Sequence, residues 1–202
     1  MTRLVLSNAR IVLADEVIDG SVAIEDGMIA AIDTGPSTRF DDVEGDYLIP
    51  GLVELHTDHL ESHFHPRPGV EWPAASAVIA HDAQIAAAGI TTVFDALRAG
   101  SFDPGDLSAR YGERLASAIH QSQANGQLRA EHFIHLRCEL PCEDTVAAAA
   151  RLLRFALRHA QFAFAQLALD PRHHQRGEQQ HHGRDHKGNA RIVIAQHDAE
   201  IR

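Results

Sequence analysis

The sequence has few of the features that mark secreted, membrane or nucleic-acid-binding proteins. Its two cysteines, Cys138 and Cys142, are too few for a disulfide framework, and their spacing is not that of a common metal or redox pair. We expect both thiols to be reduced, with Cys138 small and buried. No apolar run approaches the ~18 residues of a membrane span, and the first residues lack the parts of a secretory signal. These absences predict a soluble, cytoplasmic protein without a membrane partner.

Positive charge is also scarce, with 18 Lys and Arg against 28 Asp and Glu and a formal net charge of −10. This balance argues against nucleic acid as a partner, because little would neutralise a run of phosphates. The charge is uneven: residues 1–150 hold 9 Arg and 23 acidic residues, whereas residues 151–202 hold 8 Arg, 1 Lys and 5 acidic residues. The change predicts that residues 153–202 are an aberrant tail rich in His, Arg and Gln, either disordered or produced by a shifted reading frame.

The first 46 residues have the pattern of a small antiparallel β module. Residues 4–13 read as a strand that is interrupted at Asn8 and Ala9. Two short apolar runs then flank Asp26 and Gly27, a dipeptide that favours a tight hairpin. These signals predict a separate β domain over residues 1–46.

From residue 47 the pattern changes to strands that alternate with helices. Predicted strands cover residues 47–56, 90–97 and 131–140, and predicted helices cover residues 75–89, 106–126 and 143–160. The first two helices end at a glycine, a common stop signal. This alternation predicts three βα units on a parallel sheet, over residues 47–152.

The first of these strands places ionisable groups on one face. Because residues two apart in a strand share a face, Glu54, His56 and Asp58 are expected on one side, with Val53 and Leu55 on the side that faces the helices. An imidazole and a carboxylate at a strand end are good ligands for zinc or manganese. The pattern therefore predicts a divalent metal site.

The third strand repeats this arrangement. Its apolar face carries Ile134, Leu136 and Cys138, and its other face carries His135, Arg137 and Glu139. A single histidine at a strand end is usually an ordinary hydrogen-bonded residue. However, six His, Asp and Glu residues fall within the ten positions 56–65, which favours a metal site over a chance cluster in a solvated loop.

At this point the motifs resemble a known family. The segment IPGLVELHTDHLE resembles the first barrel strand of the amidohydrolase superfamily, although Asp58 stands where the second histidine of that motif is expected. Together with PRPGVEWP and FIHLRCELPCEDT, it resembles the branch of metal-dependent diphosphatases that act in bacterial phosphonate catabolism. The resemblance covers roughly residues 1–153.

The resemblance implies a fold and a reaction. The fold is α/β: a small N-terminal β-sandwich module (1–46), then the first three βα units (47–152) of an incomplete (β/α)8 barrel. The reaction is release of diphosphate from a phosphonate-bearing ribose 5-triphosphate, which would be the partner of the site. Homo-oligomers are expected in the full-length family.

The resemblance also suggests metal ligands. Many members of the superfamily bridge two metals with a carboxylated lysine, but the only lysine here is Lys187, in the predicted tail. Other members use a glutamate at a strand end, so Glu139 joins His56 and Asp58 as a candidate ligand of zinc or manganese. The alternative for Glu139 is a structural salt bridge, for example to Arg137.

A triphosphate also needs cationic partners, and arginine suits bidentate contact with phosphate oxygens. Arg67, held between two prolines just beyond the metal strand, is the best-placed candidate. Arg98, after the second strand, and Arg137, on the third, are further candidates. Each of the three has a surface or structural role as its alternative.

Several family features are not found in the sequence. The resemblance implies histidines from the fifth and sixth strands and a catalytic aspartate from the eighth, so we expect a truncated chain that is inactive alone, with open sheet edges. One alternative is a hydantoinase-like or dihydroorotase-like enzyme that cuts C–N bonds. Another is a non-enzymatic metal-binding protein that uses the six histidines between His173 and His197.

Overall fold

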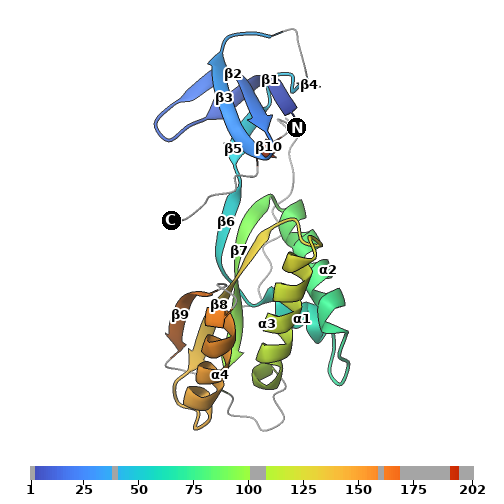
Figure 1. Ribbon diagram of the computed structural model, residues 1–202, viewed down its shortest axis with the longest axis vertical. Coiled ribbons are helices and arrows are strands. Elements are labelled where there is room, and N and C mark those ends of the chain that lie inside the picture. Colours follow the sequence, from blue (N-terminus) through green and yellow to red (C-terminus); the bar gives the residue numbers. More distant parts are fainter. Residues whose placement is uncertain (1–2, 38–40, 101–107, 159–161, 169–191, 196–202) are drawn as a thin grey trace, which may run out of the picture. The chain divides into compact units, whose positions relative to one another are not determined.

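The computed structural model describes residues 3–37, 41–100, 108–158, 162–168 and 192–195 (Figure 1). The chain divides into two compact units between Gly51 and Leu52, and we describe each unit by itself. No helix in the described ranges has the length and apolar character that crossing a membrane requires.

The first unit is a mixed β-sheet. Its six strands are β1 (Arg3–Val12), β2 (Val17–Glu25), β3 (Met28–Thr34), β4 (Asp41–Asp42), β5 (Tyr47–Pro50) and β10 (Ile192–Ala195). The strand order is β10-β5-β1-β2-β3, and β4 also pairs with β1. Only the β1, β2 and β3 pairs are antiparallel, so the predicted β module is confirmed as a β unit, but it is not purely antiparallel.

The two turn signals in this unit act as expected. The pairing of β1 with β2 shifts its register between Leu6 and Ala9, and Asn8 has a φ of 55°. At the hairpin between β2 and β3, Asp26 and Gly27 have φ values of 49° and 86°, which suits the tight turns that join antiparallel strands. The interrupted strand and the hairpin are therefore confirmed.

The predicted strand over residues 47–56 proves to be two strands. Tyr47–Pro50 pairs with β1 in the first unit, whereas β6 (Leu52–Thr57) pairs with β7 in the second. The predicted domain boundary at residue 46 is thus early, because the apolar run continues past Gly51 and local pattern alone cannot show which sheet each half joins.

The second unit is a parallel sheet with helices. After β6 come α1 (His59–Phe64), α2 (Ala74–Ala87), β7 (Ile90–Ala99), α3 (Ser108–Ala124), β8 (Glu131–Glu139), α4 (Thr145–Arg158) and β9 (Phe162–Ala168). The sheet order follows the chain, β6-β7-β8-β9, and all the pairs are parallel. The three predicted βα units are confirmed, and the described strands do not close into a barrel.

A fourth parallel strand, β9, follows these units and was not predicted. It lies within the predicted tail, and the predicted boundary at residue 153 falls inside α4. The seven residues FAFAQLA suit a strand, but the Arg, His and Gln content of the surrounding fifty residues obscured them. Residues 169–191 and 196–202 of the tail lie outside the described residues, and its origin by a frame shift stays a prediction.

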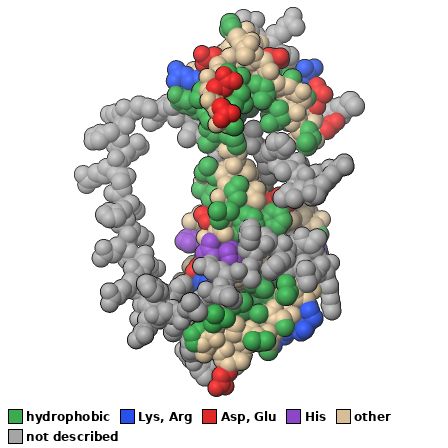
Figure 2. Space-filling view, turned by 90° about the vertical axis from the view of Figure 1, so that its left-hand side faces the viewer, with side chains coloured by type: hydrophobic (Ala, Val, Ile, Leu, Met, Phe, Trp, Pro, Cys, Tyr) green, Lys and Arg blue, Asp and Glu red, His purple; other side chains and the backbone are tan. Residues whose placement is uncertain are grey.

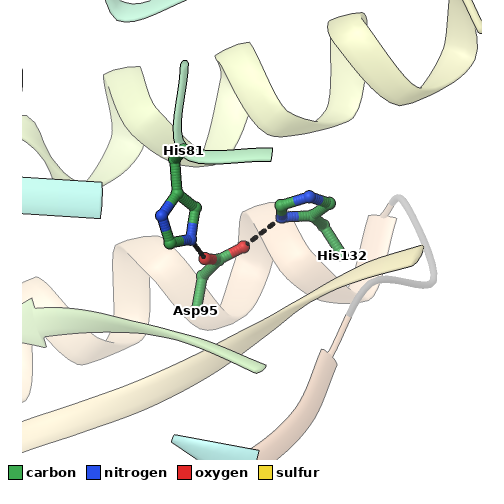
Figure 3. A group of neighbouring side chains, drawn as sticks. All are labelled: His81, Asp95 and His132. Carbon is green, nitrogen blue, oxygen red and sulfur yellow. Dashed lines mark hydrogen bonds and ion pairs between the residues drawn. The ribbon is translucent and has the colours of Figure 1, made fainter. Parts of the chain in front are cut away.

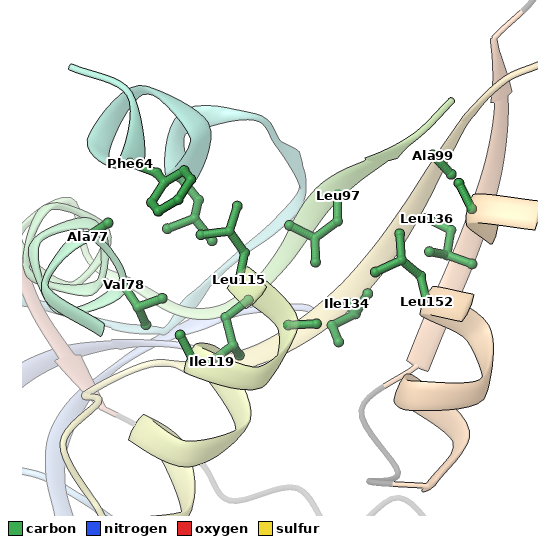
Figure 4. Packing of buried hydrophobic residues seen from close by; sticks show 14 of the residues in the cluster. Phe64, Ala77, Val78, Leu97, Ala99, Leu115, Ile119, Ile134, Leu136 and Leu152 are labelled. Carbon is green, nitrogen blue, oxygen red and sulfur yellow. The ribbon is translucent and has the colours of Figure 1, made fainter. Parts of the chain in front are cut away.

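The core of this unit lies on one face of β7 and β8, which we call the helix face (Figure 4). Leu97 and Ala99 of β7, with Ile134, Leu136 and Cys138 of β8, pack there against side chains from all four helices. The predicted apolar face of β8 is therefore confirmed, and Cys138 and Cys142 are both free and buried. The other face, which we call the opposite face, carries Arg98, His135, Arg137 and Glu139.

One predicted face is wrong. Val53 and Leu55 were expected to face the helices, but they are 54% and 63% exposed. Two register shifts interrupt the pairing of β6 with β7, so simple alternation fails along this strand. Among the described strands β6 also has a neighbour on one side only, so its other edge is unpaired.

Candidate functional site

Two candidate metal ligands meet at the end of β6. His56 Nε2 lies 3.2 Å from Asp58 Oδ1, and each side chain is 34% exposed. Figure 2 shows histidine side chains at the surface of the molecule. Glu54, expected beside them, does not join this pair, because its carboxylate accepts the backbone N–H of His56 at 3.0 Å. The pair is thus partly exposed to solvent.

Two arginines join this pair to two further carboxylates. Arg137 Nη1 donates to Asp58 Oδ2 at 2.6 Å, and Arg137 Nε lies 3.2 Å from Glu139 Oε1. Arg98 lies 3.7 Å from the same Glu139 oxygen and 3.9 Å from Glu61 Oε2. The contacts of Arg137 with Asp58 and Glu139 bring the predicted residues of β6 and β8 into one group.

His135 belongs to the same group, although the sequence did not assign it a role. Its Nδ1–H donates to the carbonyl oxygen of Leu55 at 3.2 Å, and its ring centroid lies 4.8 Å from that of His56. Burial lowers the pKa of His135, so the imidazole favours its neutral form. In the sequence, His135 could be recognised because it lies two and four residues before Arg137 and Glu139, on the same face of the strand. We call the whole set the strand-end cluster: His56, Asp58, Glu61, Arg98, His135, Arg137 and Glu139.

The strand-end cluster fits a divalent cation in part. Two atoms bound ~2.1 Å from one tetrahedral zinc ion lie about 3.4 Å apart, close to the 3.2 Å between His56 Nε2 and Asp58 Oδ1. The other ring nitrogen of His56, Nδ1, is buried and has no hydrogen bond to the described residues. Glu139, the third predicted ligand, instead contacts Arg98 and Arg137, as its structural alternative supposed.

The structure does not bring Arg67 into this cluster. Arg67 lies in the turn after α1, where its carbonyl accepts the N–H of Val70 at 3.1 Å. Its side chain is exposed and forms no hydrogen bond or ion pair with the described residues. The predicted role of Arg67 in phosphate binding therefore stays a prediction.

A second group of histidines and carboxylates lies on the helix face (Figure 3). His81 Nε2 is 2.9 Å from Asp95 Oδ1, and His132 Nδ1 is 2.7 Å from Asp95 Oδ2. The second ring nitrogen of His132 lies 3.4 Å from Asp82 Oδ1. Asp82 also accepts the backbone N–H groups of Arg129 and Ala130. We call His81, Asp82, Asp95 and His132 the buried network, because all four are 0% exposed.

Hydrogen bonds between histidine and aspartate shift the pKa values of residues in the buried network. Burial alone would lower the pKa of His132, but hydrogen bonds to Asp82 and Asp95 outweigh it and raise that pKa to about 9. Burial would raise the pKa of Asp82, but hydrogen bonds from His132, Ala130 and Arg129 lower it to about 2. At neutral pH an imidazolium thus lies between two carboxylates, which compensates charges that would otherwise be costly to bury.

The buried network could also hold a metal ion. One ligand atom each from His81, Asp95 and His132 lies within 4.8 Å of the others. This group was not predicted from the sequence. Its signal was the pair of polar residues, Asp95 and His132, on otherwise apolar strand faces, but their partners come from α2, whose docking no strand pattern reveals.

Comparison with known proteins identifies the family, although no family model matches the chain. The chain is 44% identical over 145 residues to the alpha-D-ribose 1-methylphosphonate 5-triphosphate diphosphatase of Escherichia coli K12, covering 71% of this chain and 38% of that protein. It is also 43% identical over 61 residues to the adenine deaminase of Desulfatibacillum aliphaticivorans, covering 29% and 10% of the two chains. The D-hydantoinase of Rhizobium radiobacter is 35% identical over 96 residues, covering 46% and 19%.

Solved structures are more distant. A D-hydantoinase matches with a TM-score of 0.44 and 20% identity over 76% of this chain and 31% of its own. An amidohydrolase from a Sargasso Sea environmental sample matches with a TM-score of 0.49 and 16% identity, over 78% and 42%. Scores at this level carry no argument. The family is shown by the 44% identity over 145 residues, together with the first-strand motif and the parallel βα units. The chain belongs to the amidohydrolase superfamily.

Proposed function

We propose that this chain carries part of the active site of a metal-dependent hydrolase that releases diphosphate from α-D-ribose 1-methylphosphonate 5-triphosphate. The observation that carries the proposal is the strand-end cluster, in which a histidine and carboxylates lie beside two arginines. The 44% identity to the diphosphatase of Escherichia coli supports the choice of substrate, and the chain spans 38% of that relative.

His56 and Asp58 would hold a zinc or manganese ion, with Glu139 as the further predicted ligand. An imidazole and a carboxylate are the donor types that these cations accept. When bound, such an ion supplies Lewis-acid activation of water and of the phosphoryl group. The buried network is the less suitable place for this chemistry, because none of its four side chains is exposed to a substrate.

Arg137 and Arg98 would bind the phosphate oxygens of the substrate. Arg98 lies 3.7 Å from Glu139, and Arg137 is held by its 2.6 Å hydrogen bond to Asp58. A guanidinium held in this way is already oriented, so less side-chain entropy is lost when it binds phosphate. Arg67 remains a candidate from sequence alone.

Calorimetric titration of the purified chain with the triphosphate tests the proposal, in buffer that contains zinc or manganese. We expect metal-dependent binding that Arg137→Ala weakens by more than about tenfold, since charge-assisted bonds contribute ~1.5–3 kcal/mol. Arg151→Ala is the matched control, because Arg151 is half exposed and pairs with Glu113 at the surface. Binding that is equal without metal, or equal for Arg137→Ala and Arg151→Ala, would contradict the proposal.

A C–N bond hydrolase is the second candidate, favoured by the 35% identity to a D-hydantoinase over 96 residues. A hydantoin is uncharged and carries no phosphate, so the two arginines would have no anionic partner in it. Titration with a hydantoin under the same conditions separates the two. Binding of the hydantoin in place of the triphosphate would favour the second candidate.

A further inference from the structure

The end of β6 contains a β-bulge at the site. Glu54 pairs with Val93 and Thr57 pairs with Asp95, so three steps along β6 match two steps along β7. A bulge of this kind adds one residue and turns nearby side chains away from simple alternation. His56 lies inside the bulge and Asp58 directly after it, so the bulge sets how these two side chains meet.

His135 reaches the bulge from a strand that is not its neighbour. In the sheet order, β7 lies between β6 and β8, yet His135 of β8 donates to the carbonyl of Leu55 in β6. The register partner of His135 on β7 is Ala96. A methyl group at this central position leaves space above β7, through which the imidazole can reach across to β6.

We propose that His135 is a positioning residue that holds the bulge of β6 and thereby sets His56 and Asp58 at ligand distance. This inference rests on the proposed function, in which His56 and Asp58 bind the cation. The hydrogen bond fixes the peptide group between Leu55 and His56, from which the His56 side chain departs. The edge-on contact of the two rings, with centroids 4.8 Å apart and planes at 90°, further restricts the His56 ring.

Two substitutions separate this role from direct ligation of the cation. In His135→Asn, the amide N–H can still donate to the carbonyl of Leu55, but the imidazole nitrogen that would bind a cation is gone. In His135→Phe, the ring contact with His56 is kept and the donor is lost. A positioning role therefore predicts that asparagine rescues the site and phenylalanine does not.

The test measures the affinity of each variant of the full chain for Zn²⁺, by competition with a chromogenic chelator, and the absorption spectrum with Co²⁺. We expect His135→Phe to weaken Zn²⁺ binding about 10–100-fold, as loss of a supporting hydrogen bond does elsewhere, and to alter the Co²⁺ spectrum. His135→Asn should keep most of the affinity and the wild-type spectrum. His120→Asn, on α3, is the matched control. The inference is overturned if both variants bind like the wild type, or if both lose binding equally.

A measurement on the wild-type chain covers the case in which a variant does not fold. The ¹⁵N NMR signals of His135 should show the proton on Nδ1 both with and without Zn²⁺, and a large shift of Nε2 on Zn²⁺ addition would overturn the inference by making His135 a ligand. A different result would contradict the proposed function. In that case His56→Asn and Asp58→Asn would bind Zn²⁺ like the wild type.

Discussion

Both faces of the parallel sheet carry histidine and aspartate side chains, which are buried on one face and partly exposed on the other. On the helix face, the four side chains of the buried network are 0% exposed and bond to one another and to backbone N–H groups. On the opposite face, His56 and Asp58 are each 34% exposed and lie among arginines. A histidine beside an aspartate is therefore not by itself a functional site, because packing decides whether a ligand can reach the pair.

The two groups also differ in what a lost partner would cost. In the buried network, removing the His132 imidazolium leaves Asp95 with His81 and Asp82 with Arg129, and loss of a charge partner from a buried carboxylate is strongly destabilising. At His56 and Asp58 of the strand-end cluster, partial exposure lets water replace a lost partner, so the energetic cost is small. We therefore expect substitutions in the first group to change stability and substitutions in the second to change binding.

The largest expected effect is that of His132→Leu on stability. The free energy of unfolding should fall by about 3–5 kcal/mol, because the buried carboxylates of Asp82 and Asp95 both lose the imidazolium that lies between them. Urea unfolding followed by circular dichroism measures this change. His56→Leu is the matched substitution on the opposite face and should cost less than about 1 kcal/mol. Equal losses from the two substitutions would break the comparison.

Stability should also depend on pH through His132. Its folded pKa of about 9 lies above the ordinary 6.5, so its contribution is complete below pH 6.5 and is lost as the pH rises through 9. Over that range the free energy of unfolding should fall by roughly 3 kcal/mol.

Stability should also fall at acid pH, through Asp82. The Asp82 pKa is lowered from 3.8 to about 2, so its contribution is present above pH 3.8 and is lost as the pH falls through 2. Urea unfolding at a series of pH values measures the loss of unfolding free energy at both alkaline and acid pH. His132→Asn should flatten the fall between pH 6.5 and 9, and an unchanged slope in this variant would assign the dependence to another group.

A pair of aspartate substitutions locates the metal. Asp58→Asn should weaken Zn²⁺ binding at least 10–100-fold with little change in stability, because it removes an exposed ligand. Asp95→Asn should lower the free energy of unfolding but leave Zn²⁺ affinity unchanged. Chelator competition and urea unfolding on both variants give the answer. The reverse pattern would place the metal in the buried network, where His81, Asp95 and His132 come within 4.8 Å.

The smallest expected effect is that of Arg67→Ala. Because the Arg67 side chain is exposed and outside the strand-end cluster, its loss should change stability by less than about 0.5 kcal/mol. Its effect on triphosphate affinity should be smaller than that of Arg98→Ala, measured by the same calorimetric titration. A larger loss for Arg67→Ala would support the role predicted from its sequence position and would extend the site beyond the cluster.

Prediction from sequence succeeded where a short range of the chain decides the structure. The hairpin at Asp26 and Gly27 depends on backbone preferences of two residues. The apolar face of β8 follows from alternation, and so does the grouping of Arg137 with Glu139 on its other face. Parallel pairing then brings the ends of the strands to the same edge of the sheet, which is why Asp58 and Arg137 could be expected near each other.

Prediction failed where an irregularity or a distant element decides. Two register shifts interrupt the pairing of β6 with β7, Val53 and Leu55 are exposed, and no local signal marks where an extra residue enters a strand. The predicted boundary at residue 46 missed the division between β5 and β6, since one apolar run serves two sheets. The strand β9 was hidden by the composition of its surroundings.

By itself, the sequence determined the alternation of strands and helices, the family motif at the end of β6, and the residue types that can bind a cation and phosphate. Only the tertiary structure decided which His and Asp groups remain accessible. His81 and Asp82 lie on α2, and packing of that helix onto β7 and β8 removes the buried network from water. The end of β6 keeps its His56 and Asp58 pair partly exposed, because the helices cover the other face of the sheet.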